Sequence, residues 1–110
     1  LKIAVASNIS NAGVVLGEPV TNWQEIDLVS AYGYMSINNR LVGGGHGSDV
    51  MGHPLEPLAW LANKLSLQGI SLPAKSIIIT GSIVSPKFLT PGDRAFISIE
   101  GLGTAELTVA

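Results

Sequence analysis

The hydrophobic and polar positions of this 110-residue chain follow two periods, one typical of a helix and one typical of strands. Three leucines and an alanine stand at positions 58, 61, 65 and 62, a spacing that places them on one face of an α-helix. Pro54 and Pro57 lie near its first turn, and Gly69 stands where the helix would end. The pattern predicts one amphipathic helix over about residues 54–68.

Strand patterns lie on both sides of this predicted helix. "LVSAYGYMSI" is predicted to be a strand that turns through "NNRL" into "LVGGG", and "RAFISIE" and "TAELTVA" are predicted to pair as a hairpin through "GLG". "SIIIT" (76–80) is predicted to be a strand buried on both faces, because its apolar run is almost continuous. Residues 2–5 and 13–16 are also β-rich, and Gly43, Gly44, Gly45 and Gly47 are predicted to form a flexible loop.

Composition limits the class of protein that this pattern can describe. The length allows one domain, and 46% hydrophobic against 13% charged residues suggests surface that a partner covers or a piece of a larger protein. A net charge of −2 gives no reason to expect nucleic acid or an anionic membrane as a partner, and no apolar run reaches the roughly 20 residues of a membrane span. The absence of cysteine is compatible with a cytoplasmic protein.

Motifs for known chemistry are incomplete. Gly47 and Gly52 have the spacing of a phosphate-binding loop, but His53 and Pro54 replace its lysine and hydroxyl residue. Glu25 and Asp27 are two residues apart and could face a hard cation from a strand, although solvated turn acids are the favoured interpretation. The residues alone therefore predict a β-rich domain without a complete active site.

From Val50 onward the chain resembles a known family. It is similar to the C-terminal half of the 2-keto-4-pentenoate hydratase / 2-oxo-3-hexenedioate decarboxylase branch of the fumarylacetoacetate hydrolase superfamily. The shared elements are Gly-His-Pro before the helix, "AWLANKL", Gly69, "ITGS", "PGDR" and "GLG". Upstream, "ASNISNAGVVLG" resembles the family's Ala-Asp-Asn-x-Ser segment, with Ser7 in the aspartate position.

The resemblance implies an α+β, β-dominated fold of mixed β-roll or sandwich type, with residues 1–110 as a single domain. It also implies a divalent metal, magnesium or manganese, whose ligands lie in an upstream half that this chain lacks, so no metal ligand is assigned here. It assigns substrate binding to Asn8 and Ser10 and to the turn of Thr80, Gly81 and Ser82. His53 is a possible further contact, with capping and packing as its favoured role.

The expected function is that of a lyase in aromatic compound catabolism. The main interpretation is a hydratase that converts 2-hydroxypenta-2,4-dienoate to 4-hydroxy-2-oxopentanoate. The alternatives are a 2-oxo-3-hexenedioate (4-oxalocrotonate) decarboxylase, an acylpyruvate-type hydrolase and a non-catalytic binding or assembly module. We expect the chain alone to be inactive, and we expect it to form a homo-oligomer or to associate with a missing N-terminal half.

Overall fold

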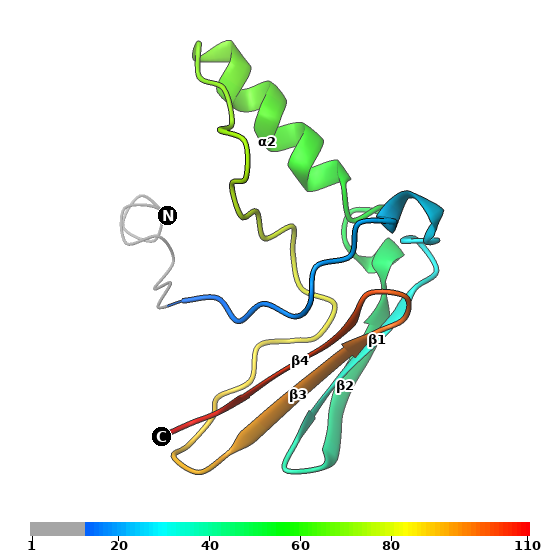
Figure 1. Cartoon of the computed structure of the whole chain (residues 1–110), viewed down its shortest axis with the longest axis vertical. Helices are drawn as coiled ribbons and strands as arrows, with labels where there is room; N and C mark the ends of the chain where they lie inside the picture. Colours follow the sequence, from blue (N-terminus) through cyan, green and yellow to red (C-terminus); the bar gives the residue numbers. More distant parts are fainter. Residues whose placement is uncertain (1–12) are drawn as a thin grey trace.

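A four-stranded antiparallel sheet is the centre of the fold in the computed structural model, which describes residues 13–110. The strand order is β2-β1-β3-β4, so each hairpin contributes one central and one edge strand (Figure 1). The strands are β1 (Tyr32–Ile37), β2 (Arg40–His46), β3 (Arg94–Ile99) and β4 (Gly103–Thr108). Both predicted hairpins and the β-dominated α+β class with one main helix are confirmed.

The β1–β2 turn is fixed by its two asparagines. Asn38 and Asn39 have φ angles of 52° and 66°, the left-handed values that a two-residue hairpin turn of type I′ requires. The Asn38 side chain also bonds across the sheet: its Oδ1 accepts the Arg94 N–H at 2.9 Å, and its Nδ2 donates to Asp93 at 2.8 Å. The turn is therefore held against the start of β3.

The predicted flexible glycine loop is wrong. Gly43, Gly44 and Gly45 lie within β2, and neither they nor Gly47 has a positive φ. These glycines instead allow close approach: a Cβ on Gly45 would lie 2.6 Å from an Asp49 carboxylate oxygen and 2.8 Å from the Ile83 carbonyl oxygen. A Cβ on Gly47 would collide with the Leu28 carbonyl oxygen.

The predicted helix is confirmed as α2 (Glu56–Leu67), which follows the 3₁₀ turn η3 (Gly47–Asp49). It ends in a Schellman motif, because the Gly69 and Ile70 N–H groups donate to the Ser66 and Leu65 carbonyls at 3.0 and 2.9 Å, with Gly69 at φ 73°. Figure 1 shows α2 extending away from one end of the sheet. Trp60 is 60% exposed on this helix.

Two predicted strands do not form. Residues 76–80 lie outside every strand, with Ile77 and Ile79 exposed by 62% and 68%. Residues 13–16 are likewise extended without strand pairing, whereas residues 2–5 lie outside the described part. An apolar run becomes a buried strand only where neighbours pair with it and cover it, and residues 13–110 supply neither here.

The two faces of the sheet differ in character. Side chains alternate along a strand, and paired residues share a face. One face, called the polar face below, carries Tyr34, Ser36, Arg94, Phe96 and Glu106. The other, called the apolar face, carries Met35, Ile97, Ile99, Ala105 and Leu107.

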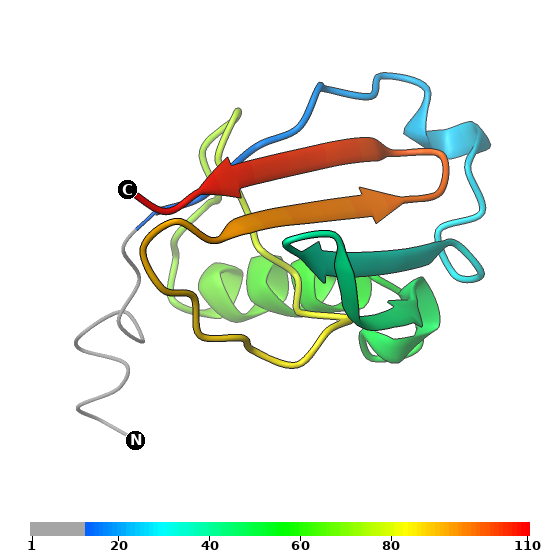
Figure 2. The same ribbon diagram turned by 90° about the horizontal axis from the view of Figure 1, so that it is seen from below.

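The long connection from α2 to β3 passes over the apolar face, where Ile83 and Val84 approach the glycines of β1 and β2 (Figure 2). Burial remains slight, because the buried apolar residues are only Ala31, Val50 and Ala95 among those described. Over the same residues, no helix is both long and apolar enough to cross a membrane.

Candidate functional site

The predicted site residues fall into three places. Asn8 and Ser10 lie outside the described residues. Thr80 and Gly81 line a cavity of about 300 Å³, whereas Ser82 lines a neighbouring hollow of about 190 Å³ over Met35 and Ile97. His53 lines neither of these two and lies in the turn before α2.

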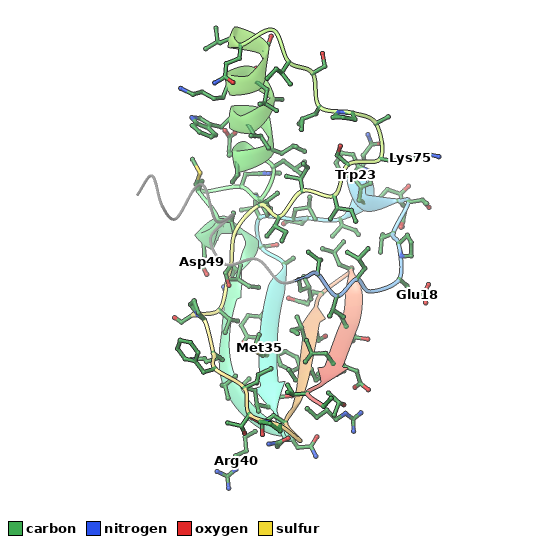
Figure 3. All side chains as sticks on the ribbon, turned by 90° about the vertical axis from the view of Figure 1, so that its left-hand side faces the viewer. Glu18, Trp23, Met35, Arg40, Asp49 and Lys75 are labelled. Atoms are coloured by element: carbon green, nitrogen blue, oxygen red, sulfur yellow. The ribbon has the colours of Figure 1, made fainter. Side chains whose placement is uncertain are left out.

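The cavity beside Thr80, called the apolar cavity below, opens at the end of the sheet from which α2 extends. Figure 3 shows Trp23 of η2 (Trp23–Glu25) at this end and Met35 farther along the strands. Four segments contribute to the wall, namely residues 23–31, residues 47–55, residues 80–83 and the β3–β4 turn. Its apolar side chains are those of Trp23, Leu28, Ala31, Val50, Pro54, Leu55, Ile83, Ile99 and Leu102.

The hydroxyls of Thr80 and Ser82 have different environments. The Ser82 Oγ donates to the Val84 carbonyl and accepts the Val84 N–H at 3.2 Å, so this hydroxyl closes its own turn. The Thr80 hydroxyl makes no hydrogen bond to any part of residues 13–110, although Thr80 is half-buried. It is therefore the side-chain hydroxyl that the turn leaves available to a ligand in the apolar cavity.

Gly81 allows this turn to approach the neck before α2. Its φ is +135°, a conformation that side-chain-bearing residues rarely adopt, and an added Cβ would lie 3.1 Å from the Val50 side chain. Val50 is itself 7% exposed and lines the apolar cavity. A larger residue at position 81 would therefore push Thr80 away from the cavity wall.

His53 makes a local bond in this structure. Its Nδ1 accepts the Leu55 N–H at 3.0 Å, and its carbonyl accepts the Glu56 N–H at 3.0 Å. The ring thus satisfies the backbone donor of Leu55 in the turn just ahead of the helix, while the helix N-terminus itself has no side-chain cap bond. This contact leaves Nε2 as the ring nitrogen that remains for any other partner.

Asp27 holds a turn. Its Oδ1 accepts the Val29 and Ser30 N–H groups, each at 3.1 Å, and its Oδ2 accepts the Ser30 hydroxyl at 2.6 Å. The bonds from Ser30 are the main cause of a pKa below the ordinary 3.8 for this carboxyl. Across residues 13–110, no three histidine or acidic side chains gather into a set that could hold a metal ion.

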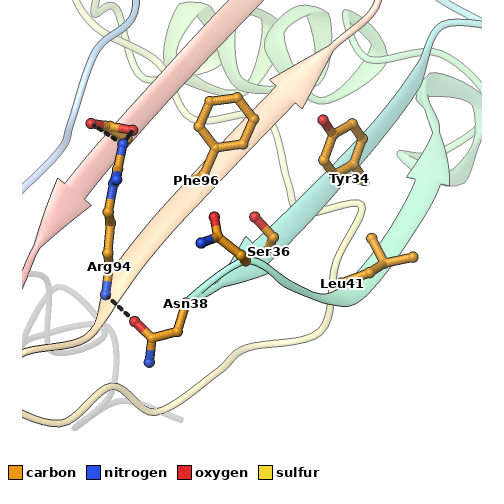
Figure 4. A pocket seen from close by; sticks show the side chains of 8 residues that line it. Tyr34, Ser36, Asn38, Leu41, Arg94 and Phe96 are labelled. Atoms are coloured by element: carbon orange, nitrogen blue, oxygen red, sulfur yellow. Dashed lines mark hydrogen bonds and ion pairs between the residues drawn. The ribbon is translucent and has the colours of Figure 1, made fainter.

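A hollow of about 620 Å³ lies on the polar face and was not anticipated from the sequence (Figure 4). Tyr34 and Phe96 line it with ring centroids 6.3 Å apart, and Arg94 pairs with Glu106 at 2.8 Å. The alternation in "YGYMSI" and "RAFISIE" was the signal that could have placed these residues together. Of the predicted site residues, those within the described part of the chain do not line this hollow.

Comparison with known proteins places the chain among enzymes of one family. Residues 5–110 match the fumarylacetoacetate (FAA) hydrolase C-terminal family. The chain is 41% identical to 2-hydroxyhexa-2,4-dienoate hydratase of Comamonas testosteroni, over 94% of this chain and 39% of that enzyme. It is 36% identical to 4-oxalocrotonate decarboxylase of Pseudomonas putida, over 91% of this chain and 38% of the relative.

A solved structure shares the fold. The 4-oxalocrotonate decarboxylase from Pseudomonas putida G7, complexed with calcium and acetate, superposes with a TM-score of 0.73 at 36% identity, covering 79% of this chain and 34% of that one. The same enzyme has also been solved with magnesium and adipate. The chain thus spans about two fifths of the length of the relatives it matches.

Proposed function

Because the chain belongs to the fumarylacetoacetate hydrolase family, we propose that it is the substrate-holding part of a metal-dependent 2-oxo acid hydratase. The proposed reaction adds water to 2-hydroxypenta-2,4-dienoate, or to a close homologue, to give a 4-hydroxy-2-oxo acid. The available Thr80 hydroxyl on the wall of an apolar cavity carries this proposal. Such a substrate needs a hydrogen-bond donor for its carboxylate and apolar walls for its carbon chain. The 41% identity to a dienoate hydratase supports the same assignment.

A decarboxylase is the second candidate. It would release CO₂ from an oxalocrotonate-type substrate, which has a carboxylate at each end. The observations that favour it are the 36% identity to a decarboxylase and the shared fold at a TM-score of 0.73. The two candidates differ in what lies at the far end of the substrate, which is an uncharged carbon chain in one and a second carboxylate in the other.

The residues of this chain would bind and orient the substrate. The Thr80 hydroxyl donates to the substrate carboxylate, while Gly81 and Ser82 hold the turn in place. We assign Asn8 and Ser10 to the polar side of the same pocket, and we assign His53 to positioning the start of α2. The apolar walls exclude water around the carbon chain, which strengthens the hydrogen bond to the carboxylate.

The proposed metal is magnesium or manganese, bound by residues outside this chain. The side chains of residues 13–110 do not fit a metal ion, since no ligand set gathers among them. A divalent metal in the complete site would act as a Lewis acid toward the 2-oxo group. We therefore expect the 110-residue chain alone to show no turnover.

Residues 1–110 would form a single domain that is the C-terminal part of the family's catalytic domain. The rest of the catalytic domain would cover the apolar surface of this part. Among the described residues, only Ala31, Val50 and Ala95 are buried apolar residues, which leaves much apolar surface for a partner to cover. Trp60, Leu67, Ile77 and Ile79 contribute apolar surface with exposures of 60–85%. Sedimentation of the chain with and without the complementary part would test this, and a second copy as the only partner would count against it.

A chimera tests the proposed activity. Residues 1–110 would replace the matching segment of the Comamonas hydratase, of which they span 39%, and magnesium-dependent hydration would be measured. Thr80→Val should raise the KM about ten- to a hundredfold, because a hydrogen bond to a charged group contributes roughly 1.5–3 kcal/mol. Thr104→Val, in a strand outside the apolar cavity, is the matched control and should leave the KM unchanged. A chimera that folds but hydrates no dienoate would refute the proposal.

A further inference from the structure

The walls of the apolar cavity suit the uncharged carbon chain of a substrate better than a charged carboxylate. Its side chains carry no formal charge, and the largest of them are Trp23, Leu28, Leu55, Ile99 and Leu102. Thr80 supplies its one side-chain hydroxyl. The volume of about 300 Å³ is at the small end of the range for ligand pockets, so the cavity fits a short carbon chain rather than a large cofactor.

We propose that this cavity selects substrates whose far end is uncharged and apolar, and that Trp23, Val50 and Leu102 determine this specificity. The inference rests on the proposed function and narrows its substrate class to monocarboxylic 2-hydroxy or 2-oxo dienoic acids. With Thr80 bonded to the first carboxylate, the carbon chain lies against these three side chains. The transfer of an alkyl tail from water to these apolar side chains has a favourable free energy.

Moving a second carboxylate, at the far end of the substrate, from water into the apolar cavity would be unfavourable. A charged group buried against apolar walls costs free energy unless it is paired or hydrogen-bonded. The polar side-chain groups of the wall are the Thr80 hydroxyl, which is committed to the first carboxylate in this arrangement, and the indole N–H of Trp23, a neutral donor that offers no charge to pair with a second carboxylate. The cavity therefore disfavours a dicarboxylic acid of the same length.

The three residues come from separate segments, so the shape of the cavity depends on the fold. Val50 is buried and packs near Gly81, Trp23 is 43% exposed at the rim, and Leu102 lies in the β3–β4 turn. Leu102 is the best position for a test, because a turn residue at partial exposure can accept a longer side chain with little repacking.

The test is direct binding to the 110-residue chain, with Trp23 as the reporter. The chain has two tryptophans, so Trp60→Phe, at an exposed position of α2, leaves Trp23 as the single tryptophan, which can be excited selectively at roughly 295 nm or longer, where tyrosine does not absorb. Hexa-2,4-dienoate and hexa-2,4-dienedioate are the probes, equal in carbon number and different in one carboxylate. We expect the monoacid to bind at least tenfold more tightly than the diacid.

Leu102→Lys should weaken binding of the monoacid and strengthen binding of the diacid. The ratio of the two affinities should therefore fall at least tenfold. Leu41→Lys makes the same change beside the hollow of the polar face and should leave the preference unchanged. Equal affinities, a preference for the diacid, or no binding of either probe would overturn the inference, as would equal responses of the two variants.

Turnover by the chimera separates this inference from the proposed function. A chimera active on the diacid alone would overturn the inference while the family activity stands. Preferential binding of the monoacid by the chain, together with a folded chimera that hydrates neither acid, would support the selectivity of the cavity and refute the proposed hydratase.

Discussion

The sheet and helix α2 are equally regular in their backbones, but their apolar side chains are covered to different degrees. In the sheet, β1 and β3 are each bonded on both sides, and the segment around Ile83 packs over their apolar face. In α2 the C-terminal Schellman motif is formed, yet no residue of the helix is buried and Leu67 is 85% exposed. The comparison shows that caps and turns are local properties of the sequence, whereas burial of an apolar stripe depends on what packs against it.

The difference agrees with the length of the relatives. The chain spans about two fifths of each enzyme that it matches. Under the proposal above, the cover of α2 would come from a complementary part of the domain, since most helical stability comes from tertiary packing. The sheet should therefore behave as the stable unit of this chain, and α2 should depend on a partner.

The largest expected effect is a difference in amide hydrogen exchange between these two regions. We expect the amides of α2 to exchange at least about a hundredfold faster than those of Met35 and Ile97, because local opening of an uncovered helix costs little. Exchange measured by NMR on the 110-residue chain checks this. Equal protection in both regions would mean that α2 unfolds together with the sheet. The expected difference in local stability between α2 and the sheet would then be wrong. Adding the complementary part should slow exchange in α2 selectively.

Gly47→Ala should give the next largest effect, because Gly47 lies in the connection between strand β2 and helix α2. The new Cβ would meet the Leu28 carbonyl, a backbone atom that cannot rotate away, and overpacking of this kind costs up to about 3 kcal/mol. At this upper figure the melting temperature should fall by roughly 12–24 °C. Gly13→Ala is the control, since its Cβ would meet nothing within 4 Å. A similar melting temperature for both variants would show that this connection is not rigid.

The local features of the fold could be read from the sequence. The leucine spacing, Pro57 and Gly69 were enough to place α2, since they act within one helix. The asparagine pair and "GLG" placed both hairpin turns for the same reason. The glycines of β2 were misassigned because their reason is tertiary, namely the close approach of Val84 at Gly43, of the Tyr32 side chain at Gly44 and of the Ile83 carbonyl at Gly45.

The candidate site was predictable in part. Thr80 and Gly81 were assigned by resemblance to a family motif, and the structure places both on the apolar cavity. Trp23 and Leu102 were missed, because they come from loops that no periodicity links to Thr80. The run at 76–80 misled for a physical reason: its isoleucines have the composition of a buried strand but no pairing partner among residues 13–110.

A smaller effect is expected at the β1–β2 turn, which offers a matched pair of substitutions. Asn38 and Asn39 both have positive φ, but only the Asn38 side chain bonds to another part of residues 13–110. Asn38→Gly should destabilise the sheet by roughly 1 kcal/mol through loss of the bond to the Arg94 N–H. Asn39→Gly should be neutral or slightly stabilising, because glycine suits this φ. Urea unfolding of both variants tests this expectation. Equal unfolding midpoints would show that the cross-sheet bond of Asn38 does not stabilise the sheet.

The smallest expected effect is an acid dependence that arises at Asp93, in the turn before β3. The Thr90 N–H, and then the Asn38 side-chain amide, hold the pKa of this carboxyl below its ordinary 3.8. Because the folded state has the lower pKa, the stabilising contribution is present above pH 3.8 and is lost as the pH falls through the depressed folded value. Asp93→Asn should therefore be less stable than the parent chain near neutral pH, and the difference should shrink below pH 3.8.

Asp27 provides the comparison for this titration, since its lowered pKa arises from Ser30 in a turn that belongs to no strand. Asp27→Asn should change the acid dependence in the same direction but leave exchange at Met35 and Ile97 unaffected, whereas Asp93→Asn should speed exchange at the ends of β1 and β3. Urea midpoints measured from pH 2 to 6 at low salt, with exchange at neutral pH, separate the two carboxylates. If Asp93→Asn kept the full acid dependence of the parent chain, the titration would have to be assigned to other carboxyls, and the turn before β3 would hold the sheet through its uncharged hydrogen bonds alone.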